Sequence, residues 1–97
     1  MKLVIVPAAL AELEDTASFY SANGSPALGL AFVAEFENAI KAALAHPTIG
    51  APFHKLARRV FLRRFPHAVI YQTTATELRV IAIMHVRRRP GYWLSRK

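Results

Sequence analysis

The chain has 97 residues, 54% of them hydrophobic, so it can bury one core but is too short for two domains. It contains no cysteine, which excludes disulfides and thiolate metal sites. No apolar run approaches the roughly 20 residues that span a bilayer, and no secretory leader is recognisable. We therefore expect a single domain over residues 1–97, located in the cytoplasm and without membrane contact.

The net charge of +7 is divided unevenly along the chain. Residues 1–46 carry two lysines against five acidic residues, a balance of −3. Residues 47–97 carry eleven basic residues against Glu77 alone, a balance of +10. A strongly basic half indicates an anionic partner, which is nucleic acid, an acidic protein or both. A basic surface without a fixed partner is the alternative.

The first part of the chain predicts a strand followed by a helix. The β-branched run at residues 2–6 is typical of a strand. Pro7 ends it and suits the first turn of a helix, where no backbone N–H is needed. Residues 21–25 interrupt the helix, and we expect Asn23 and Gly24 to form a left-handed C-cap. The apolar residues of this helix recur at helical spacing: Leu10, Leu13, Ala17 and Tyr20.

A second helix is predicted directly after this turn. Ser25 is a suitable N-cap and Pro26 suits the first turn, whereas His46 and Pro47 mark the end. Because the connection between the helices is short, we expect an antiparallel helical hairpin. The apolar residues of the second helix step by four: Leu28, Phe32, Phe36, Ile40 and Leu44.

The second half changes to strand patterns. Residues 47–55 carry two prolines and a glycine and predict a loop. Residues 57–64 and 67–73 predict strands, with a polar turn at 74–77. Residues 78–86 are apolar at both odd and even positions, as in a central strand that is covered on both faces. The order β-α-α-β-β-β predicts an α+β fold, with a helical hairpin on one face of a mostly antiparallel sheet and a basic C-terminal tail.

The tail at residues 85–93 combines a histidine, three arginines and two aromatic residues. Guanidinium groups suit the recognition of phosphate or carboxylate. Tyr92 and Trp93 either stack on a base, pack the tail onto the sheet, or anchor a partner. We interpret the tail as a recognition element more than a complete active site. The candidate target-binding residues are Arg59, Arg63, Arg64, Arg87, Arg88, Arg89 and Trp93.

Histidine is the other chemically informative residue type. His85, at a predicted strand end beside the arginines, is suited to acid or base chemistry or to a structural hydrogen bond. The other three histidines, at 46, 54 and 67, show no metal-ligand spacing. We therefore expect neither a metal site nor a cofactor.

The chain resembles the toxins of bacterial type II toxin–antitoxin systems in the RelE/ParE superfamily, and the ParE-like members more closely. The resemblance lies in residues 7–20, 31–50, 58–72 and 80–93. Its most specific part is an arginine-rich strand, Phe-Pro, a strand with Ile-Tyr, and then His-x-Arg-Arg. The resemblance implies a toxic protein neutralised by a cognate antitoxin, in a hetero-oligomer with it. RelE-like members cut mRNA on the ribosome, whereas ParE-like members inhibit DNA gyrase.

An ungapped comparison with the RelE-like nucleases separates these two activities. The two strand lysines of the nucleases fall on Arg59 and Phe61, and their strand arginine falls on Ala68. Their last arginine falls on Arg87, and their C-terminal tyrosine falls on Trp93. Since indole cannot exchange a proton near neutral pH and Ala68 has no charge, the pattern argues against RelE-type cleavage.

Three hypotheses follow, in order of preference. The first is a ParE-like toxin that binds a target such as DNA gyrase and catalyses nothing. The second is a ribosome-dependent mRNA endonuclease, in which Tyr92 replaces the missing tyrosine. The third is a nucleic-acid-binding module that is neither an enzyme nor a toxin. The candidate catalytic residues of the second hypothesis are Arg59, His85, Arg87 and Tyr92.

Overall fold

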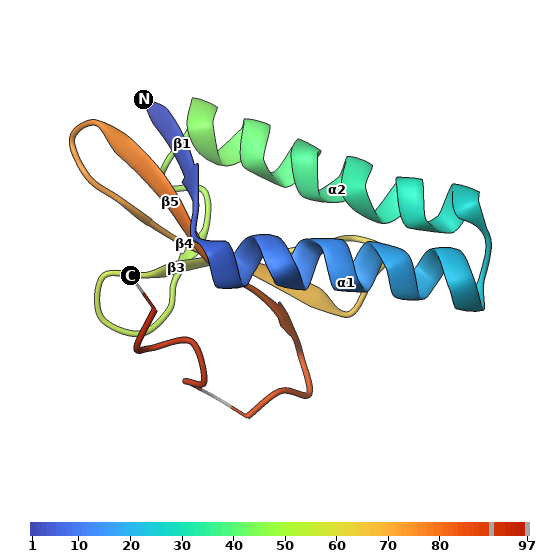
Figure 1. The fold of residues 1–97 in the computed structure, drawn as a ribbon. Helices are drawn as coiled ribbons and strands as arrows, with labels where there is room; N and C mark the ends of the chain where they lie inside the picture. Colours follow the sequence, from blue (N-terminus) through green and yellow to red (C-terminus); the bar gives the residue numbers. More distant parts are fainter. Residues whose placement is uncertain (90, 97) are drawn as a thin grey trace.

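The computed structural model describes residues 1–89 and 91–96. Its elements are β1 (Lys2–Ile5), α1 (Pro7–Asn23), α2 (Pro26–Ala45), β2 (Ala51–Pro52), β3 (Arg58–Phe61), β4 (His67–Thr73) and β5 (Glu77–His85). The strands form one sheet in the order β1-β5-β4-β3-β2, with β1 parallel to β5 and the other pairs antiparallel. Figure 1 shows α1 and α2 side by side as a hairpin. The predicted α+β fold with a mostly antiparallel sheet is confirmed.

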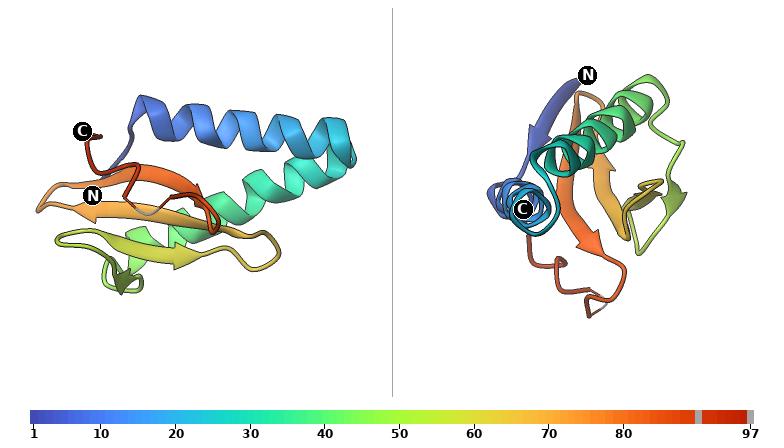
Figure 2. Two further views of the ribbon diagram at one scale, coloured as in Figure 1. Left: turned by 90° about the horizontal axis from the view of Figure 1, so that it is seen from below. Right: turned by 90° about the vertical axis from the view of Figure 1, so that its right-hand side faces the viewer.

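The two helices cover one face of the sheet. α1 begins with Pro7 after an extended Val6, and α2 begins after Ser25, whose side chain accepts a hydrogen bond from the Leu28 N–H at 3.1 Å. In the left view of Figure 2, α2 passes behind the strands and the C-terminal segment lies in front of them. The residues that α2 buries are Gly29, Phe32, Phe36, Ile40 and Ala43.

The turn between the helices differs from the prediction, because Gly24 is not left-handed. Its φ is −124° and its ψ is −95°. The N–H groups of Gly24 and Ser25 both donate to the Tyr20 carbonyl, at 2.9 and 3.1 Å. A Cβ atom on Gly24 would lie 2.6 Å from the Leu28 side chain and 2.9 Å from the Tyr20 oxygen. Glycine is therefore needed here for close packing of the turn, and not for a positive φ.

The region before β4 also differs from the prediction. The strand expected over 57–64 is only four residues long, and the loop expected over 47–55 contains the two-residue strand β2. β3 ends early because the Leu62 N–H donates to the His67 carbonyl at 2.9 Å, which closes the turn into β4. Pro52 is tolerated in β2 because this strand is at the edge of the sheet.

The central strand β5 is buried on both faces, as predicted. One face packs against α1 and the other is covered by the C-terminal segment, where Trp93 is 3% exposed. The Trp93 ring packs against Phe53 with a centroid distance of 5.8 Å. Gly91, at φ +79°, reverses the chain before this contact; Pro90, which the sequence suggests as a breaker, lies outside the described residues. None of the helices in the described part of the chain combines the length and the apolar composition needed to span a membrane.

Candidate functional site

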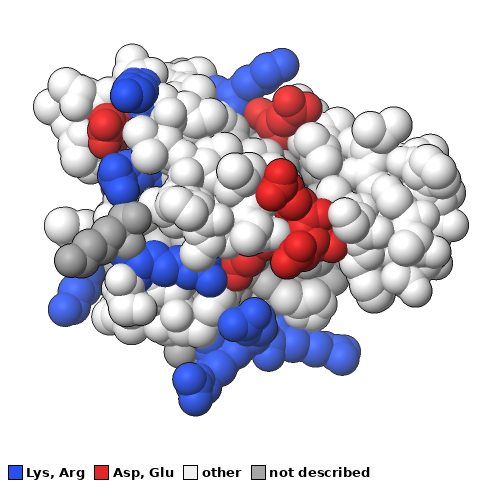
Figure 3. All heavy atoms as spheres, in the orientation of Figure 1, with Lys and Arg blue, Asp and Glu red and all other residues white. Residues whose placement is uncertain are grey.

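Two basic loops meet at one end of the sheet. The Val86 N–H donates to the Pro66 carbonyl at 2.9 Å, and His67 pairs with His85 in the β4–β5 register. The β3–β4 loop and the segment after β5 are therefore neighbours. We define the basic end by the arginines of these two loops: Arg63, Arg64, Arg87, Arg88 and Arg89. Figure 3 shows basic side chains gathered along the lower margin of the molecule, where the segment after β5 runs in Figure 1, and acidic side chains beside them.

The turn at residues 87–89, here called the arginine turn, is held by hydrogen bonds of its backbone and not by its guanidinium groups. The Arg88 N–H donates to the His85 carbonyl at 2.9 Å, and the Arg87 N–H donates to His85 Nδ1 at 3.0 Å. The side chains of Arg87, Arg88 and Arg89 are exposed. Arg88 places its guanidinium carbon 3.9 Å from the Tyr92 ring centroid, in cation–π contact. The turn therefore presents its positive charge on a fixed backbone.

Glu12 of α1 fixes the segment that follows this turn. Its carboxylate accepts hydrogen bonds from the Tyr92 hydroxyl at 2.6 Å and from Arg96 Nη1 at 2.6 Å. It also accepts a hydrogen bond from the Ile83 N–H at 3.0 Å. This N–H lies on the edge of β5 that pairs with β1, beyond the last paired residue of β5, Val80. One carboxylate thus closes a strand edge and holds the C-terminal segment against α1.

The two aromatic residues of the tail are structural in this arrangement. Trp93 is buried, so its side chain is not presented to a partner as the sequence interpretation expected. Burial raises the pKa of Tyr92 well above its ordinary value, and the hydrogen bond to Glu12 adds to this shift. A tyrosine in this state is a poor proton donor or acceptor near neutral pH.

The strand arginines do not join the basic end. Arg58 donates to the Gly50 carbonyl at 2.8 Å and so serves the β2 region. Arg59 lies with its guanidinium carbon 4.1 Å from the Phe53 ring centroid and 4.7 Å from that of Phe61. A single basic surface that includes these two residues is therefore not formed.

The candidate nuclease residues are only partly brought together. His85, Arg88 and Tyr92 line a pocket of about 210 Å³ beside α1. Arg59 lies two strands away, with β4 between β3 and β5. It also lies on the other face, because its neighbour Val60 lines a groove with α2 and successive strand residues point to opposite faces. Within residues 1–89 and 91–96, no group of three His, Asp or Glu residues is arranged to hold a metal ion.

A buried histidine, which the sequence does not single out, supports this end of the sheet. His67 is 5% exposed, and its ring lies 5.1 Å from those of Phe32 and His85, between centroids. Its Nδ1 has no hydrogen-bond partner among the described residues. Burial lowers the pKa of His67 to about 4, and the charge that His85 carries when protonated adds to the effect. His67 therefore stays neutral in the folded protein at neutral pH.

His67 is expected to make stability dependent on pH. The unfolded chain binds a proton on this residue below about pH 6.5, whereas the folded protein does so only near pH 4. Stability should be full above this window and fall by about 3 kcal/mol as the pH drops through it. Urea titrations of the protein and of His67→Phe measure the effect. An equally steep loss in His67→Phe would assign the pH dependence to other groups.

Comparison with known proteins identifies the fold and the family of the chain. A solved structure described as "Chromosomal ParDE TA system from P. aeruginosa" has the same fold, with a TM-score of 0.76 and 22% sequence identity. The similarity covers 88% of this chain and 95% of that chain. No curated protein matches the chain. Residues 3–90 match the family described as "ParE toxin of type II toxin-antitoxin system, parDE". The chain belongs to this family and is a ParE-type toxin of a type II toxin–antitoxin system.

Proposed function

We propose that this toxin inhibits growth by binding DNA gyrase through the basic end, without catalysing a reaction itself. The observation that carries the proposal is the arginine turn at residues 87–89, with a hydrogen-bonded backbone and exposed guanidinium groups. Arginine is prominent among residues that dominate binding interfaces, and its planar fork matches carboxylates and phosphates. Gyrase as the partner follows from the activity of the ParE-like toxins that the sequence resembles. A supercoiling assay with purified gyrase tests the proposal.

Cleavage of mRNA is the second candidate, favoured by the pocket that His85, Arg88 and Tyr92 share. Three features weigh against it. Ala68 and Trp93 stand where the nucleases carry an arginine and a tyrosine, and the Tyr92 hydroxyl is held by Glu12. The loss of a transition-state cation and of a proton-transfer group should each lower the rate by about 10²-fold or more.

We further propose that a short antitoxin neutralises this protein. The acidic partner is inferred from the balance of +10 in residues 47–97. An amphipathic acidic segment would order on binding and cover apolar surface of the helical hairpin or of a sheet edge. The ParDE description of the similar solved structure supports a partner of this kind.

Co-expression with the protein encoded by the adjacent reading frame should give a stable hetero-oligomer. The complex is expected to survive moderate salt, because apolar burial contributes beside the screened charge pairs. Size-exclusion chromatography at low and raised salt measures this. Recovery of the chain alone from the co-expressing cells, together with no toxicity when the chain is expressed by itself, would contradict the assignment of an antitoxin partner.

A further inference from the structure

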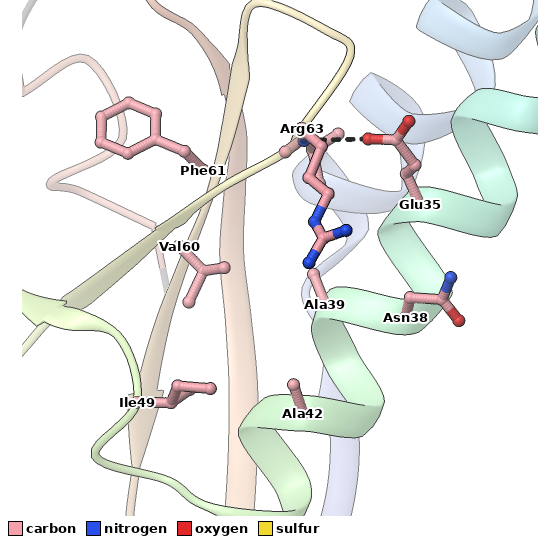
Figure 4. Close-up of a pocket in the computed structure, with 9 residues that line it drawn as sticks. Glu35, Asn38, Ala39, Ala42, Ile49, Val60, Phe61 and Arg63 are labelled. Atoms are coloured by element: carbon pink, nitrogen blue, oxygen red, sulfur yellow. Dashed lines mark hydrogen bonds between the residues drawn. The ribbon is translucent and has the colours of Figure 1, made fainter.

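Each of the two helices contributes one carboxylate beside the basic end, and the two carboxylates have different partners. Glu35 of α2 accepts the backbone N–H of Arg63 at 2.9 Å, the bond drawn in Figure 4, and forms an ion pair with Arg64 at 2.6 Å. Glu12 of α1 pairs with Arg96 at 2.6 Å, and among the described residues it forms no ion pair with the arginine turn. Glu35 therefore neutralises an arginine of the basic end, whereas Glu12 leaves the charge of the arginine turn free.

Glu12 fixes the position of the Tyr92 ring. The Tyr92 hydroxyl donates to one carboxylate oxygen at 2.6 Å, and the other oxygen accepts the Ile83 N–H of β5 at 3.0 Å. Arg96 donates to both oxygens, from Nη1 at 2.6 Å and from Nη2 at 3.2 Å, and its Nη1 also donates to the Ile81 carbonyl at 3.2 Å. The carboxylate thus joins α1, β5 and the C-terminal segment, and the ring is held in one position relative to the sheet.

Arg88 in turn contacts the Tyr92 ring. Its guanidinium carbon lies 3.9 Å from the ring centroid, and the guanidinium carbon of Arg96 lies 5.0 Å from the same centroid. Two like charges this close to one ring repel each other, and the carboxylate of Glu12 offsets the repulsion by pairing with Arg96. A guanidinium group that contacts a ring through its face keeps its N–H groups for a carboxylate or a phosphate. The arrangement therefore orients the Arg88 side chain without neutralising it.

We propose that Glu12 is a positioning residue for target binding, which acts through the Tyr92 ring to hold the Arg88 guanidinium in place for an anionic group of the target. The backbone of the arginine turn does not need Glu12, because the N–H groups of Arg87 and Arg88 donate to His85. The effect of Glu12 is therefore confined to the Arg88 side chain, and Arg87 serves as an internal control. The inference rests on the proposed function only in that the target is gyrase.

Nuclear magnetic resonance of the Arg88 side chain tests the positioning without gyrase. Protons that lie over an aromatic ring resonate upfield, so the Arg88 side-chain protons of the parent protein should be shifted upfield. Glu12→Gln should return them to the position of an exposed arginine. Glu14→Gln removes the same charge from the same helix and should leave them unchanged, because Glu14 is exposed and forms no ion pair among the described residues. Unchanged Arg88 resonances in Glu12→Gln would overturn the proposal.

Tyr92→Phe decides the question if Glu12→Gln does not fold. This substitution removes only the hydroxyl that donates to Glu12, and it keeps the ring, the carboxylate and Arg96. Without this bond the ring is free to turn away from Arg88, so the upfield shift of the Arg88 protons should decrease. A shift equal to that of the parent would contradict an action of Glu12 through the Tyr92 ring.

A double-mutant cycle with purified gyrase distinguishes positioning from a general loss of stability. The readout is the concentration of folded toxin that half-inhibits supercoiling. Glu12→Gln should weaken inhibition about tenfold in the parent and in Arg87→Ala, but no more than about twofold in Arg88→Ala. Equal weakening in all three backgrounds would contradict an action through Arg88. If the parent protein does not inhibit gyrase, the proposed function fails, and the Arg88 resonances still decide the inference.

Discussion

The double variant Arg87→Ala, Arg88→Ala is expected to lose growth inhibition while it stays folded. The arginine turn is formed by backbone N–H groups that donate to His85, and the substitutions leave these unchanged. They do remove the cation–π interaction of Arg88 with the Tyr92 ring, which is worth about 1 kcal/mol at an exposed site. At an interface, truncation of an anchoring arginine costs about 2 kcal/mol or more, so two truncations should weaken target binding by about a thousandfold.

Growth of induced cultures and the melting temperature of the purified variant measure the two effects. Arg79→Ala is a matched control, because Arg79 is a partly exposed arginine of β5 that pairs with Glu77 at 3.4 Å, away from the basic end. This control should remain toxic. Full toxicity of the double variant would exclude the arginine turn as the recognition element and leave Arg63 and Arg64 as the next candidates.

Trp93→Ala is expected to have the opposite profile, with a large loss of stability. The side chain is 3% exposed and packs against Phe53 on the sheet face that the helices leave uncovered. Removal of a buried tryptophan side chain typically costs about 3–5 kcal/mol. In a domain of this size, each kcal/mol lowers the melting temperature by about 4–8 °C, so we expect a fall of more than about 10 °C.

Thermal unfolding followed by near-ultraviolet circular dichroism measures this loss. Trp93→Phe keeps an aromatic ring against Phe53, so it should recover much of the stability. The indole Nε1 has no hydrogen-bond partner among the described residues, and the cost should therefore come from packing alone. A melting temperature close to that of the parent would mean that the C-terminal segment is not packed as described.

The sequence predicts the elements well where the signal is local. Leu28, Phe32 and Phe36 step by four, and the prolines mark the helix starts, so both helices are found with nearly correct ends. β2 has only two residues and carries a proline, so its pattern cannot be distinguished from a loop. Gly24 is correctly placed at a helix end, but its reason is a contact with Leu28 that no dihedral preference predicts.

The candidate site is harder to predict because its contacts are distant in sequence. The acidic residues of α1 suit the helix dipole, and this local interpretation hides the bonds of Glu12 to Ile83, Tyr92 and Arg96. Charge alone suggests that all the arginines share a surface, yet Arg59 is stacked between aromatic rings on another part of the sheet. The grouping of Arg87, Arg88 and Arg89 is predicted correctly because the three residues are adjacent in the sequence.

The most direct test of the proposed function is a paired assay with purified components. One arm measures DNA supercoiling by gyrase, and the other measures cleavage of mRNA on stalled ribosomes, over the same range of toxin concentrations. We predict that supercoiling is inhibited at concentrations that leave the mRNA intact, and that Arg87→Ala, Arg88→Ala relieves the inhibition. Codon-specific cleavage of the mRNA with unaffected gyrase would contradict a binding toxin and establish the endonuclease instead.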